Sequence, residues 1–352
     1  MKIAITGKPF VGKSTIFRAI TRATEDNHLI GKPNIGIVKV PDERLEFLSQ
    51  TFQPKKTTNA ELAFADFVGF ENLGSALEKN LSVLNQLRTA EALAIVYKLF
   101  DVDQKNSPES AIEEWESELL LVDLQVVENR LDNIKRSSKG KKSLPNDKEK
   151  DLLLVCKDCI ESGKPLRLLA LNESEKKLLR DLQMLSIKPV IRVFNIPESL
   201  LDKPKEEWPQ ILQTQPTSSM AVTSICGEID LEISQLDEMD KKDFMKEMAI
   251  EELGSNKLIR TTYNLLGLIS FFTVGKDEVK AWTIRKNTKA VKAARVIHSD
   301  IEKGFIRAEL ISYKDFKNCG SMSEGKNKGM VRLEGKNYIV QDGDIINFRF
   351  NV

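Results

Sequence analysis

The feature that most constrains this chain is a glycine-rich motif that begins at residue 7. Residues 7–15 read Gly-Lys-Pro-Phe-Val-Gly-Lys-Ser-Thr and match the pattern G-x-x-x-x-G-K-[ST]. The alternating residues 1–6 before the motif predict a half-buried strand, and residues 16–20 after it predict a helix. A strand, a glycine-rich loop and a helix in this order are the context that a phosphate-binding loop requires. The motif therefore predicts a site for a nucleoside triphosphate.

Each residue type in the motif has a physical role in holding phosphate. Glycines allow a tight loop whose backbone N–H groups converge on phosphate oxygens, and the helix N-terminus adds partial positive charge. Lys13 is expected to reach the terminal phosphates, and the Ser14 hydroxyl is expected to ligate Mg²⁺. The nucleotide-binding residues predicted in this loop are Gly7, Phe10, Val11, Gly12, Lys13, Ser14 and Thr15.

A carboxylate at the end of a later strand predicts the second metal ligand. Residues 61–67 read as a strand, and Asp66 lies at its carboxyl end, where a Walker-B carboxylate is expected beside a P-loop. We therefore expect Ser14 and Asp66 to hold the Mg²⁺ ion together. Gly69, which completes the sequence D-x-x-G, is expected to offer its backbone N–H to a terminal phosphate.

Composition excludes several other classes of protein. Of the 352 residues, 41% are hydrophobic and 30% are charged, which is typical neither of disordered nor of membrane proteins. Lysine and arginine total 53 against 52 acidic residues, so contact with RNA would need a local basic patch. No apolar run spans a bilayer and no signal peptide is recognised. We expect a cytoplasmic protein, a monomer, with neither DNA nor a membrane as its partner.

Strands and helices alternate at first and then stop alternating. Strands predicted at 34–40, 61–67 and 92–100, with a helix at 77–90, favour a doubly wound parallel α/β sheet. From residue 108 onward a helix is predicted that pairs with a second helix over 147–160 in a coiled-coil hairpin. The apolar positions of its expected seam are Ile112, Trp115, Leu119, Val122 and Val126.

The connection between these two helices is basic. Residues 135–142 contain five basic side chains, which form either a solvated loop or a patch that meets RNA phosphates. A helix predicted over 173–185 and strands predicted over 188–195 and 220–223 return the chain to the sheet. The helical pair is therefore interpreted as an insertion.

The last segment differs in pattern. Short alternating runs over 269–274, 305–311, 338–340 and 345–350, separated by glycines, predict a small and mostly β domain. The glycine- and lysine-rich run 320–329 is predicted to be a flexible loop, because no strand and helix flank it as they would a phosphate site.

The cysteines do not indicate a metal centre. Cys156 and Cys159 have the spacing C-x-x-C, but the chain has two histidines and four cysteines in all, so a zinc site lacks ligands. We expect both to lie on a helix or pack as small apolar side chains.

Across nearly the whole chain the residues resemble the YchF-type Obg-like ATPases, which are P-loop NTPases. The most specific matches are residues 279–283 (Val-Lys-Ala-Trp-Thr), 298–309 and 333–344, with 163–167 as a further match. The resemblance implies association with the ribosome or ribosomal RNA, and slow ATP hydrolysis linked to translation or stress. It also implies a discontinuous P-loop NTPase (G) domain at 1–106 and 188–266, a coiled-coil insertion at 107–187 and a β-grasp (TGS) domain at 267–352.

The preferred base is predicted from Asn195-Ile196-Pro197-Glu198. Guanine-specific relatives have N-K-x-D here, and their carboxylate accepts hydrogen bonds from guanine donors that adenine lacks. YchF-type proteins have N-x-x-E instead. We therefore predict that Asn195, Ile196 and Glu198 bind the base and that ATP is preferred, with a GTP-preferring GTPase as the alternative.

The chain departs from the family pattern at the groups that support hydrolysis. Phe10 replaces an asparagine, and Ile30 stands where a metal-binding threonine is usual, with Thr24 as a possible substitute. The glycine-rich second switch is reduced to Gly-Ser at residues 74–75. Phe70, directly after the D-x-x-G motif, stands where Ras-like proteins have the glutamine that orients the attacking water. No catalytic residue is therefore assigned. A divergent, non-hydrolysing nucleotide-binding regulator stays the main alternative, and a small-molecule kinase is disfavoured because clustered lid arginines are absent.

Overall fold

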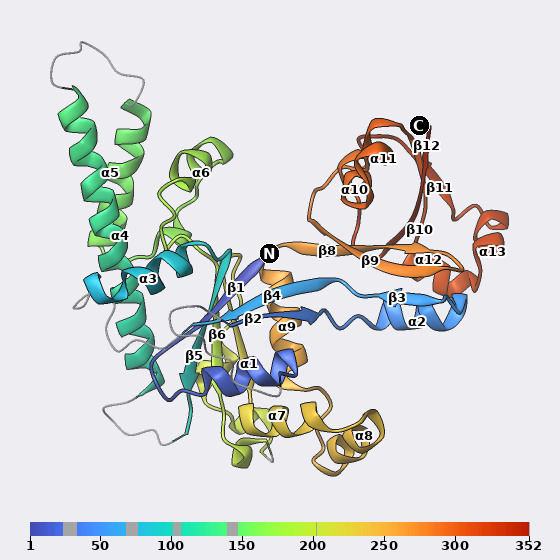
Figure 1. Ribbon diagram of the computed structural model, residues 1–352, viewed down its shortest axis with the longest axis horizontal. Helices are drawn as coiled ribbons and strands as arrows, with labels where there is room; N and C mark the ends of the chain where they lie inside the picture. The colour runs from blue at the N-terminus through green and yellow to red at the C-terminus, as the bar shows by residue number, and fades with distance from the viewer. Residues whose placement is uncertain (24–33, 68–76, 101–106, 139–146, 202, 352) are drawn as a thin grey trace. The chain divides into compact units, whose positions relative to one another are not determined.

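The structure is a computed structural model (Figure 1), and it describes residues 1–23, 34–67, 77–100, 107–138, 147–201 and 203–351. The chain divides into two compact units. Residues 1–36 and 63–261 form the first, and residues 37–62 and 262–352 form the second. The predicted mixed α/β fold with an inserted pair of helices is confirmed.

A six-stranded sheet organises the first unit. Its order is β2-β4-β1-β5-β6-β7, and β1 pairs in parallel with β4 and β5, β5 with β6, and β6 with β7. Because β4, β1, β5, β6 and β7 are parallel, their carboxyl ends meet at one edge, where ligands of such sheets bind. The strands are β1 Lys2–Thr6, β2 Asn34–Lys39, β4 Glu61–Asp66, β5 Ala92–Lys98, β6 Val190–Asn195 and β7 Met220–Ile225.

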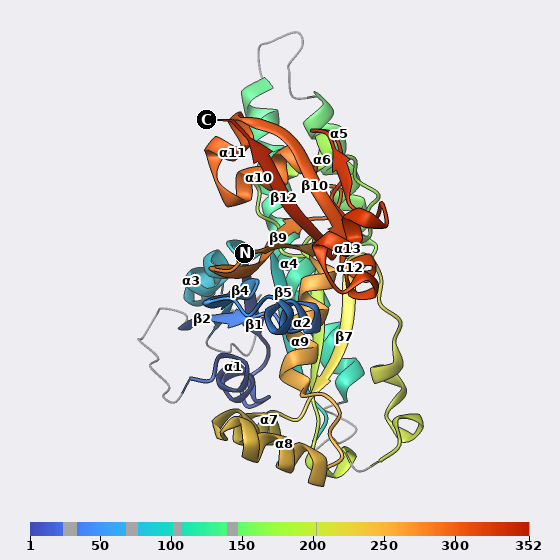
Figure 2. The same cartoon turned by 90° about the vertical axis from the view of Figure 1, so that its right-hand side faces the viewer.

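Helices cover this sheet because its central strands are apolar on both faces, as in other parallel sheets. Helices α1 (Lys13–Thr21) and α7 (Gly227–Gln235) lie side by side (Figure 2). On β5, the side chains of Leu93, Ile95 and Tyr97 share a core with residues of α3 (Leu77–Arg88) and α4 (Pro108–Ser138). The remaining helices of this unit include α6 Glu173–Arg180, α8 Glu238–Glu247 and α9 Gly254–Leu265. Helix α9 ends in the second unit. The short 3₁₀ helices are Leu166–Leu168, Glu198–Leu200, Lys205–Glu207 and Gln210–Gln213.

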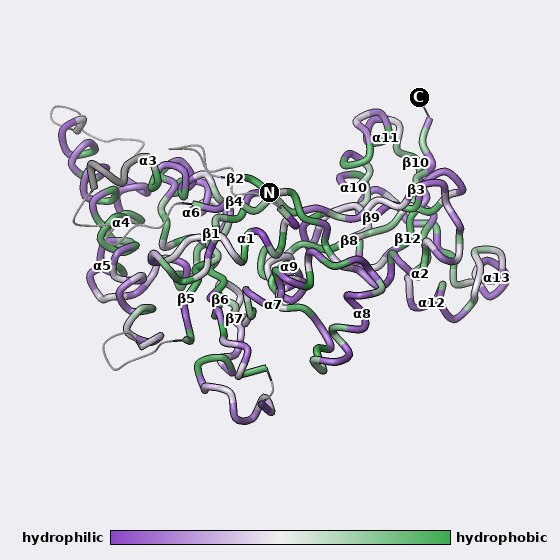
Figure 3. Tube along the Cα trace, turned by 60° about the horizontal axis from the view of Figure 1, so that its bottom comes forward, coloured by the Kyte–Doolittle hydropathy of each residue, from purple (hydrophilic) through white to green (hydrophobic). Residues whose placement is uncertain are grey.

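Helices α4 and α5 (Asp147–Glu161) form the predicted hairpin, and hydrophobic and hydrophilic residues alternate along both (Figure 3). The predicted seam is wrong in part. Ile112, Trp115, Leu119 and Val122 pack into the core of the sheet. The contact with α5 is made by other residues of α4, further along that helix. They are Leu120, Val127, Leu131 and Ile134, which share a buried cluster with Leu152, Leu153, Cys156 and Ile160 of α5.

One helix of the first unit is shorter than predicted, and two cysteines lie on a helix as predicted. The helix predicted over 173–185 ends at Arg180, and it begins with a capping box between Asn172 and Glu175. Cys156 and Cys159 both lie on α5 as free cysteines, Cys156 buried and Cys159 partly exposed, as predicted. Burial raises the pKa of the Cys156 thiol to about 11, so this side chain behaves as a packing group and not as a reactive thiolate.

The second unit has its own six-stranded sheet, in the order β11-β10-β12-β8-β9-β3. Its strands are β3 Lys56–Thr58, β8 Leu268–Val274, β9 Glu278–Arg285, β10 Phe305–Ser312, β11 Arg332–Glu334 and β12 Asp344–Phe350. Its helices are α2 Glu43–Phe52, α10 Ala290–Ile297, α11 Ser299–Lys303, α12 Tyr313–Cys319 and α13 Met322–Asn327.

Two expectations for this unit are wrong. Residues 338–340 form no strand, since only Ile339 makes an isolated bridge, to Lys289. The run 320–329 is not a loop throughout, because α13 lies within it. Ser321 caps that helix by accepting a hydrogen bond from the Glu324 N–H, which favours a helix despite Gly325 in its interior.

Residues 37–62 are a structural part of the second unit. In α2, Leu45 and Leu48 are buried, and the Phe52 ring stacks on the Phe316 ring with centroids 5.5 Å apart. Strand β3 pairs in parallel with β9 at an edge of the sheet. Residues far apart in sequence therefore share one core.

Among the described residues, none of the helices is both long and apolar enough to cross a membrane.

Candidate functional site

The predicted phosphate-binding loop joins β1 to α1 as the sequence required. Two of its glycines adopt backbone angles that favour glycine, with φ 148° at Gly7 and φ 89° at Gly12. A Cβ atom on Gly7 would lie 2.6 Å from the Val96 carbonyl oxygen, and one on Gly12 would overlap the side-chain amide of Asn195. Both positions therefore exclude any larger residue.

Phe10 is the unusual member of this loop. It has φ 61°, in the left-handed region, and its side chain is 94% exposed. A non-glycine residue in that region carries backbone strain, and full exposure of the ring adds no burial that would offset it. Phe10 is therefore part of the loop through its backbone, while its ring contributes nothing to the core.

Lys13 is held at the start of α1 with its ammonium inside the loop. The residue is only 7% exposed, and its Nζ donates a hydrogen bond to the Lys8 carbonyl oxygen at 2.6 Å. Burial lowers the pKa of Lys13, while the nearby Asp66 carboxylate raises it. An anion bound in the loop would place a second negative charge, besides that of Asp66, next to this buried ammonium.

Ser14 and Asp66, the two predicted metal ligands, are in contact. The Ser14 hydroxyl donates to Asp66 Oδ2 at 3.0 Å, and Asp66 is 1% exposed at the end of β4. The register that pairs Ile5 with Asp66 brings the carboxylate level with the start of the loop. One hydroxyl and one carboxylate, both hard oxygen donors, match what Mg²⁺ takes from a protein before phosphates and water complete its coordination. The residues present therefore fit the ion.

Asn195 ties the end of β6 to two other loops. Its Nδ2 donates to the Val11 carbonyl oxygen at 3.1 Å, and its Oδ1 accepts from the Gly227 N–H at 3.0 Å. The side chain is buried, so both bonds form away from solvent. Asn195 thus fixes the phosphate-binding loop relative to the start of α7.

The other two predicted base-binding residues differ in exposure. Ile196 is buried and its N–H donates to the Ile225 carbonyl oxygen at 2.9 Å. Its side chain lines a cavity of about 390 Å³ together with Trp208, Cys226 and Met248, and no described residue of the phosphate-binding loop lines this cavity. Glu198 is exposed at the start of a 3₁₀ turn. Ile196 therefore packs in the core of the first unit, and Glu198 has the exposure that contact with a base requires.

The segment 224–227 was missed by the sequence analysis. It lies at the carboxyl end of β7, and Gly227 begins α7 with its N–H bonded to Asn195. A Cβ atom on Gly227 would lie 3.2 Å from Asn195 Oδ1, so a side chain is disfavoured. The sequence did contain a signal for this segment, because residues 224–227 directly follow the last predicted strand of the sheet, at the edge where ligands bind.

Several sequence-predicted positions lie outside the described residues. They are Gly69, expected to contact phosphate, and the departures from the family pattern at Thr24, Ile30, Phe70 and residues 74–75. Among the described residues no group of three or more His, Cys, Asp or Glu side chains is arranged to hold a metal ion. The Ser14 and Asp66 pair is of a different kind, since it relies on a bound polyphosphate for further ligands.

A parallel sheet with a glycine loop, a buried lysine and a serine–aspartate pair at its carboxyl edge defines the class of P-loop nucleotide-binding proteins. The family model described as 50S ribosome-binding GTPase matches residues 2–130. The family model YchF-GTPase_C, described as a protein of unknown function (DUF933), matches residues 268–351.

Comparison with known proteins identifies a family within this class. "Ribosome-binding ATPase YchF" of Bacillus subtilis is 38% identical, with 99% of this chain and 98% of the relative covered. The protein of that name in Escherichia coli O157:H7 is 35% identical, with 100% and 99% covered. The structure of the Schizosaccharomyces pombe YchF GTPase has a TM-score of 0.83 at 27% identity, covering 99% and 97%. This chain belongs to the YchF family, as the sequence analysis predicted.

Proposed function

We propose that this protein binds ATP together with Mg²⁺ and hydrolyses it slowly, in association with the ribosome. The observation that carries the proposal is the hydrogen bond between Ser14 and Asp66, beside the buried ammonium of Lys13. The relatives named as ribosome-binding ATPases support the ribosomal association and the choice of ATP.

In this proposal the chain's own residues act mainly by position and charge. The loop amides and Lys13 would bind the phosphates, and Ser14 and Asp66 would hold the metal ion, which would neutralise charge on the phosphate oxygens. Asn195 keeps the loop in place through Val11. We assign no general base, and positioning without such a group is consistent with slow turnover.

Base preference is the finer part of the proposal. The bacterial relatives are named ATPases, and the yeast structure is named a GTPase. Glu198 replaces the aspartate that reads guanine in N-K-x-D proteins, and its longer side chain is exposed. A hydrogen-bonding site discriminates strongly only when its carboxylate reaches both guanine donors, so we propose that ATP is preferred.

We further propose the domain limits implied by the family resemblance, with a P-loop domain at 1–106 and 188–266, a hairpin at 107–187 and a TGS domain at 267–352. These limits follow the order of the sequence, and residues 37–62 within the first of them belong to the second compact unit. The end of the hairpin, which includes Lys135 and Arg136 of α4, would meet ribosomal RNA through its basic charge. We also propose a monomer in the cytoplasm.

The test is a calorimetric titration of the full chain with ATP and with GTP, in Mg²⁺ and in a chelator. We expect ATP to bind more tightly than GTP, Mg²⁺ to strengthen binding, and Lys13→Ala to remove most of the affinity. Single-turnover phosphate release with and without ribosomes then tests hydrolysis. Tight ATP binding without phosphate release in either condition would support a non-hydrolysing regulator instead, and a preference for GTP would overturn the assignment of the base.

A further inference from the structure

The side chain of Lys8 connects the phosphate-binding loop to helix α4. Lys8 is the second residue of the loop, and its ammonium forms an ion pair with the Glu114 carboxylate. The two side chains are 37% and 39% exposed, so the pair lies near the surface of the first unit. The motif G-x-x-x-x-G-K-[ST] leaves this position free, so phosphate binding by the loop does not by itself require a cation there.

The backbone of the same residue holds the ammonium that is proposed to bind phosphate. The Lys8 carbonyl oxygen accepts the hydrogen bond from Lys13 Nζ. A displacement of Lys8 would therefore change where Lys13 points. Through its carbonyl and its side chain, Lys8 contacts both the central cation of the site and the inserted helix.

Helix α4 is well suited to transmit a displacement at this point. Next to Glu114, the side chains of Ile112 and Trp115 are buried in the core of the sheet. The helix then continues without a break to Ser138, a further distance of about 36 Å at 1.5 Å per residue. Lys135 and Arg136 lie in its last turn. One rigid element therefore carries both the contact to the loop and basic side chains at its far end.

We propose that Lys8 is a positioning residue, and that its ion pair with Glu114 couples occupancy of the nucleotide site to the state of the hairpin. The inference rests on the proposed ATP binding. With the pair formed, the loop holds Lys13 in the position that receives phosphate. A phosphate-rich partner such as RNA, bound at the far end of α4, would alter ATP affinity. Thermodynamic linkage requires that ATP alter the affinity for that partner by the same factor.

The neighbouring carboxylate of Glu113 supplies a matched control. Glu113 is exposed and adjacent on the same helix, so Glu113→Gln removes the same charge from nearly the same place. If charge alone acted on bound polyphosphate, Glu113→Gln and Glu114→Gln would both bind ATP slightly more tightly. If the pair positions the loop, Glu114→Gln binds ATP about two- to fivefold more weakly, the range expected for an exposed ion pair. Glu113→Gln then matches the wild type or exceeds it.

Charge exchange provides a readout that a general loss of packing would not give. Lys8→Glu alone should weaken ATP binding, and combining it with Glu114→Lys should restore at least half of the lost affinity. Hydrogen exchange on the full chain adds a second measurement, in which ATP is expected to change protection over residues 107–138 in the wild type but not in Lys8→Met.

The outcomes separate this inference from the proposed function. Wild-type protein that binds no ATP overturns both. Wild-type protein that binds ATP, with equal affinities for Glu113→Gln and Glu114→Gln or with no recovery on charge exchange, overturns the coupling alone.

Discussion

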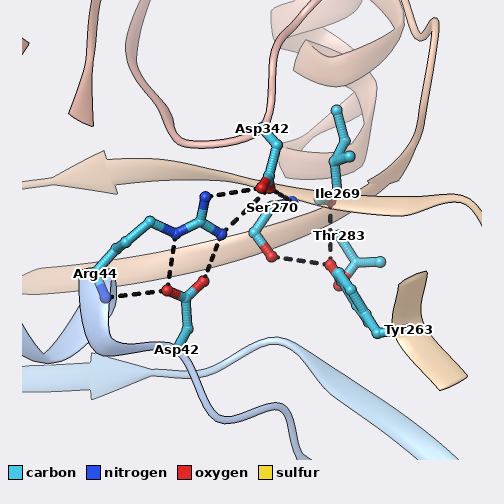
Figure 4. Close-up of polar contacts among 7 residues, drawn as sticks. All are labelled: Asp42, Arg44, Tyr263, Ile269, Ser270, Thr283 and Asp342. Atoms are coloured by element: carbon cyan, nitrogen blue, oxygen red, sulfur yellow. Dashed lines mark hydrogen bonds and ion pairs between the residues drawn. The ribbon is translucent and has the colours of Figure 1, made fainter. Parts of the chain in front are cut away.

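Arg44 and Asp342 form an ion pair that joins α2 to the loop before β12, across 298 residues of sequence (Figure 4). Arg44 Nη1 lies 2.8 Å from Asp342 Oδ2, and the same guanidinium bonds to both carboxylate oxygens of Asp42. Asp342 Oδ1 in turn accepts the Ser270 N–H at 2.9 Å. The pair therefore fixes residues 42–44 to β8 and to the turn that precedes β12, all within the second unit.

Loss of this guanidinium is expected to destabilise the second unit. In Arg44→Met, Asp42 and Asp342 lose their shared partner and the contact with the Phe272 ring changes. We expect a loss of about 1–3 kcal/mol in the free energy of unfolding, the range for breaking a partly buried network of charge-assisted bonds. Denaturant unfolding of the full chain measures it. Arg295→Met, which removes an exposed arginine of α10 in the same unit, is the control and should change stability by less than about 0.5 kcal/mol. Equal effects of the two substitutions would contradict the role given to Arg44.

Residues 42–44 also show what sequence patterns could and could not predict. The strands of the first sheet and the glycine loop were predictable because their signals are local: alternation or apolar runs, and glycines at fixed spacing. That residues 37–62 build the second unit was not predictable in this way, because the contacts of Phe52 and Arg44 are made with residues some 260 to 300 positions away.

The hairpin illustrates a second limit. Ile112, Trp115, Leu119 and Val122 have the spacing of a coiled-coil seam, and the same spacing also describes any helix that packs one face on a sheet. Periodicity identified the helix and its buried face, but it could not identify the neighbour. In the site, the pairing of Ser14 with Asp66 followed from the motif and the strand order, whereas the Gly227 contact depended on the third dimension.

Gly12 is expected to tolerate no side chain, for two separable reasons. Its φ of 89° is strained for alanine, and an added Cβ would overlap Asn195 Nδ2. Gly163 isolates the first reason, because its φ of 74° is similar and an added Cβ would meet nothing within 4 Å. We expect Gly163→Ala to cost about 1 kcal/mol of stability without changing ATP affinity. Gly12→Ala should lower ATP affinity at least tenfold in calorimetry, because the displaced Asn195 no longer holds the loop. Equal ATP affinities in the two variants would show that the overlap is relieved without disturbing the loop.

Asn195→Asp tests the bridging amide with almost no change in volume. The substituted carboxylate can still accept from the Gly227 N–H, but it cannot donate to the Val11 carbonyl oxygen, and two oxygens then face each other. We expect ATP affinity to fall about tenfold and stability to fall by about 1–3 kcal/mol, since a buried acceptor loses its donor. Asn347→Asp, at an exposed position of β12, is the control and should leave both unchanged. Wild-type ATP affinity in Asn195→Asp would exclude a positioning role for this amide.

Glu309 is expected to make the stability of the second unit depend on acid pH. Hydrogen bonds from Lys326 and Arg349 lower the pKa of Glu309 below its ordinary value of 4.5. A carboxyl group whose pKa is lower in the folded than in the unfolded state contributes stability above the unfolded value, and that contribution is lost as the pH falls through the folded value. In the wild type we therefore expect stability to decrease as the pH drops below 4.5. Glu309→Gln should lower stability at pH 7 and make the acid dependence shallower. Unfolding curves between pH 3 and 7 measure this, with Glu46→Gln on the exposed face of α2 as the control. If the pH profile of Glu309→Gln ran parallel to the wild-type profile, the carboxylate would contribute no pH-linked stability and the ion pairs with Lys326 and Arg349 would be fully screened by solvent.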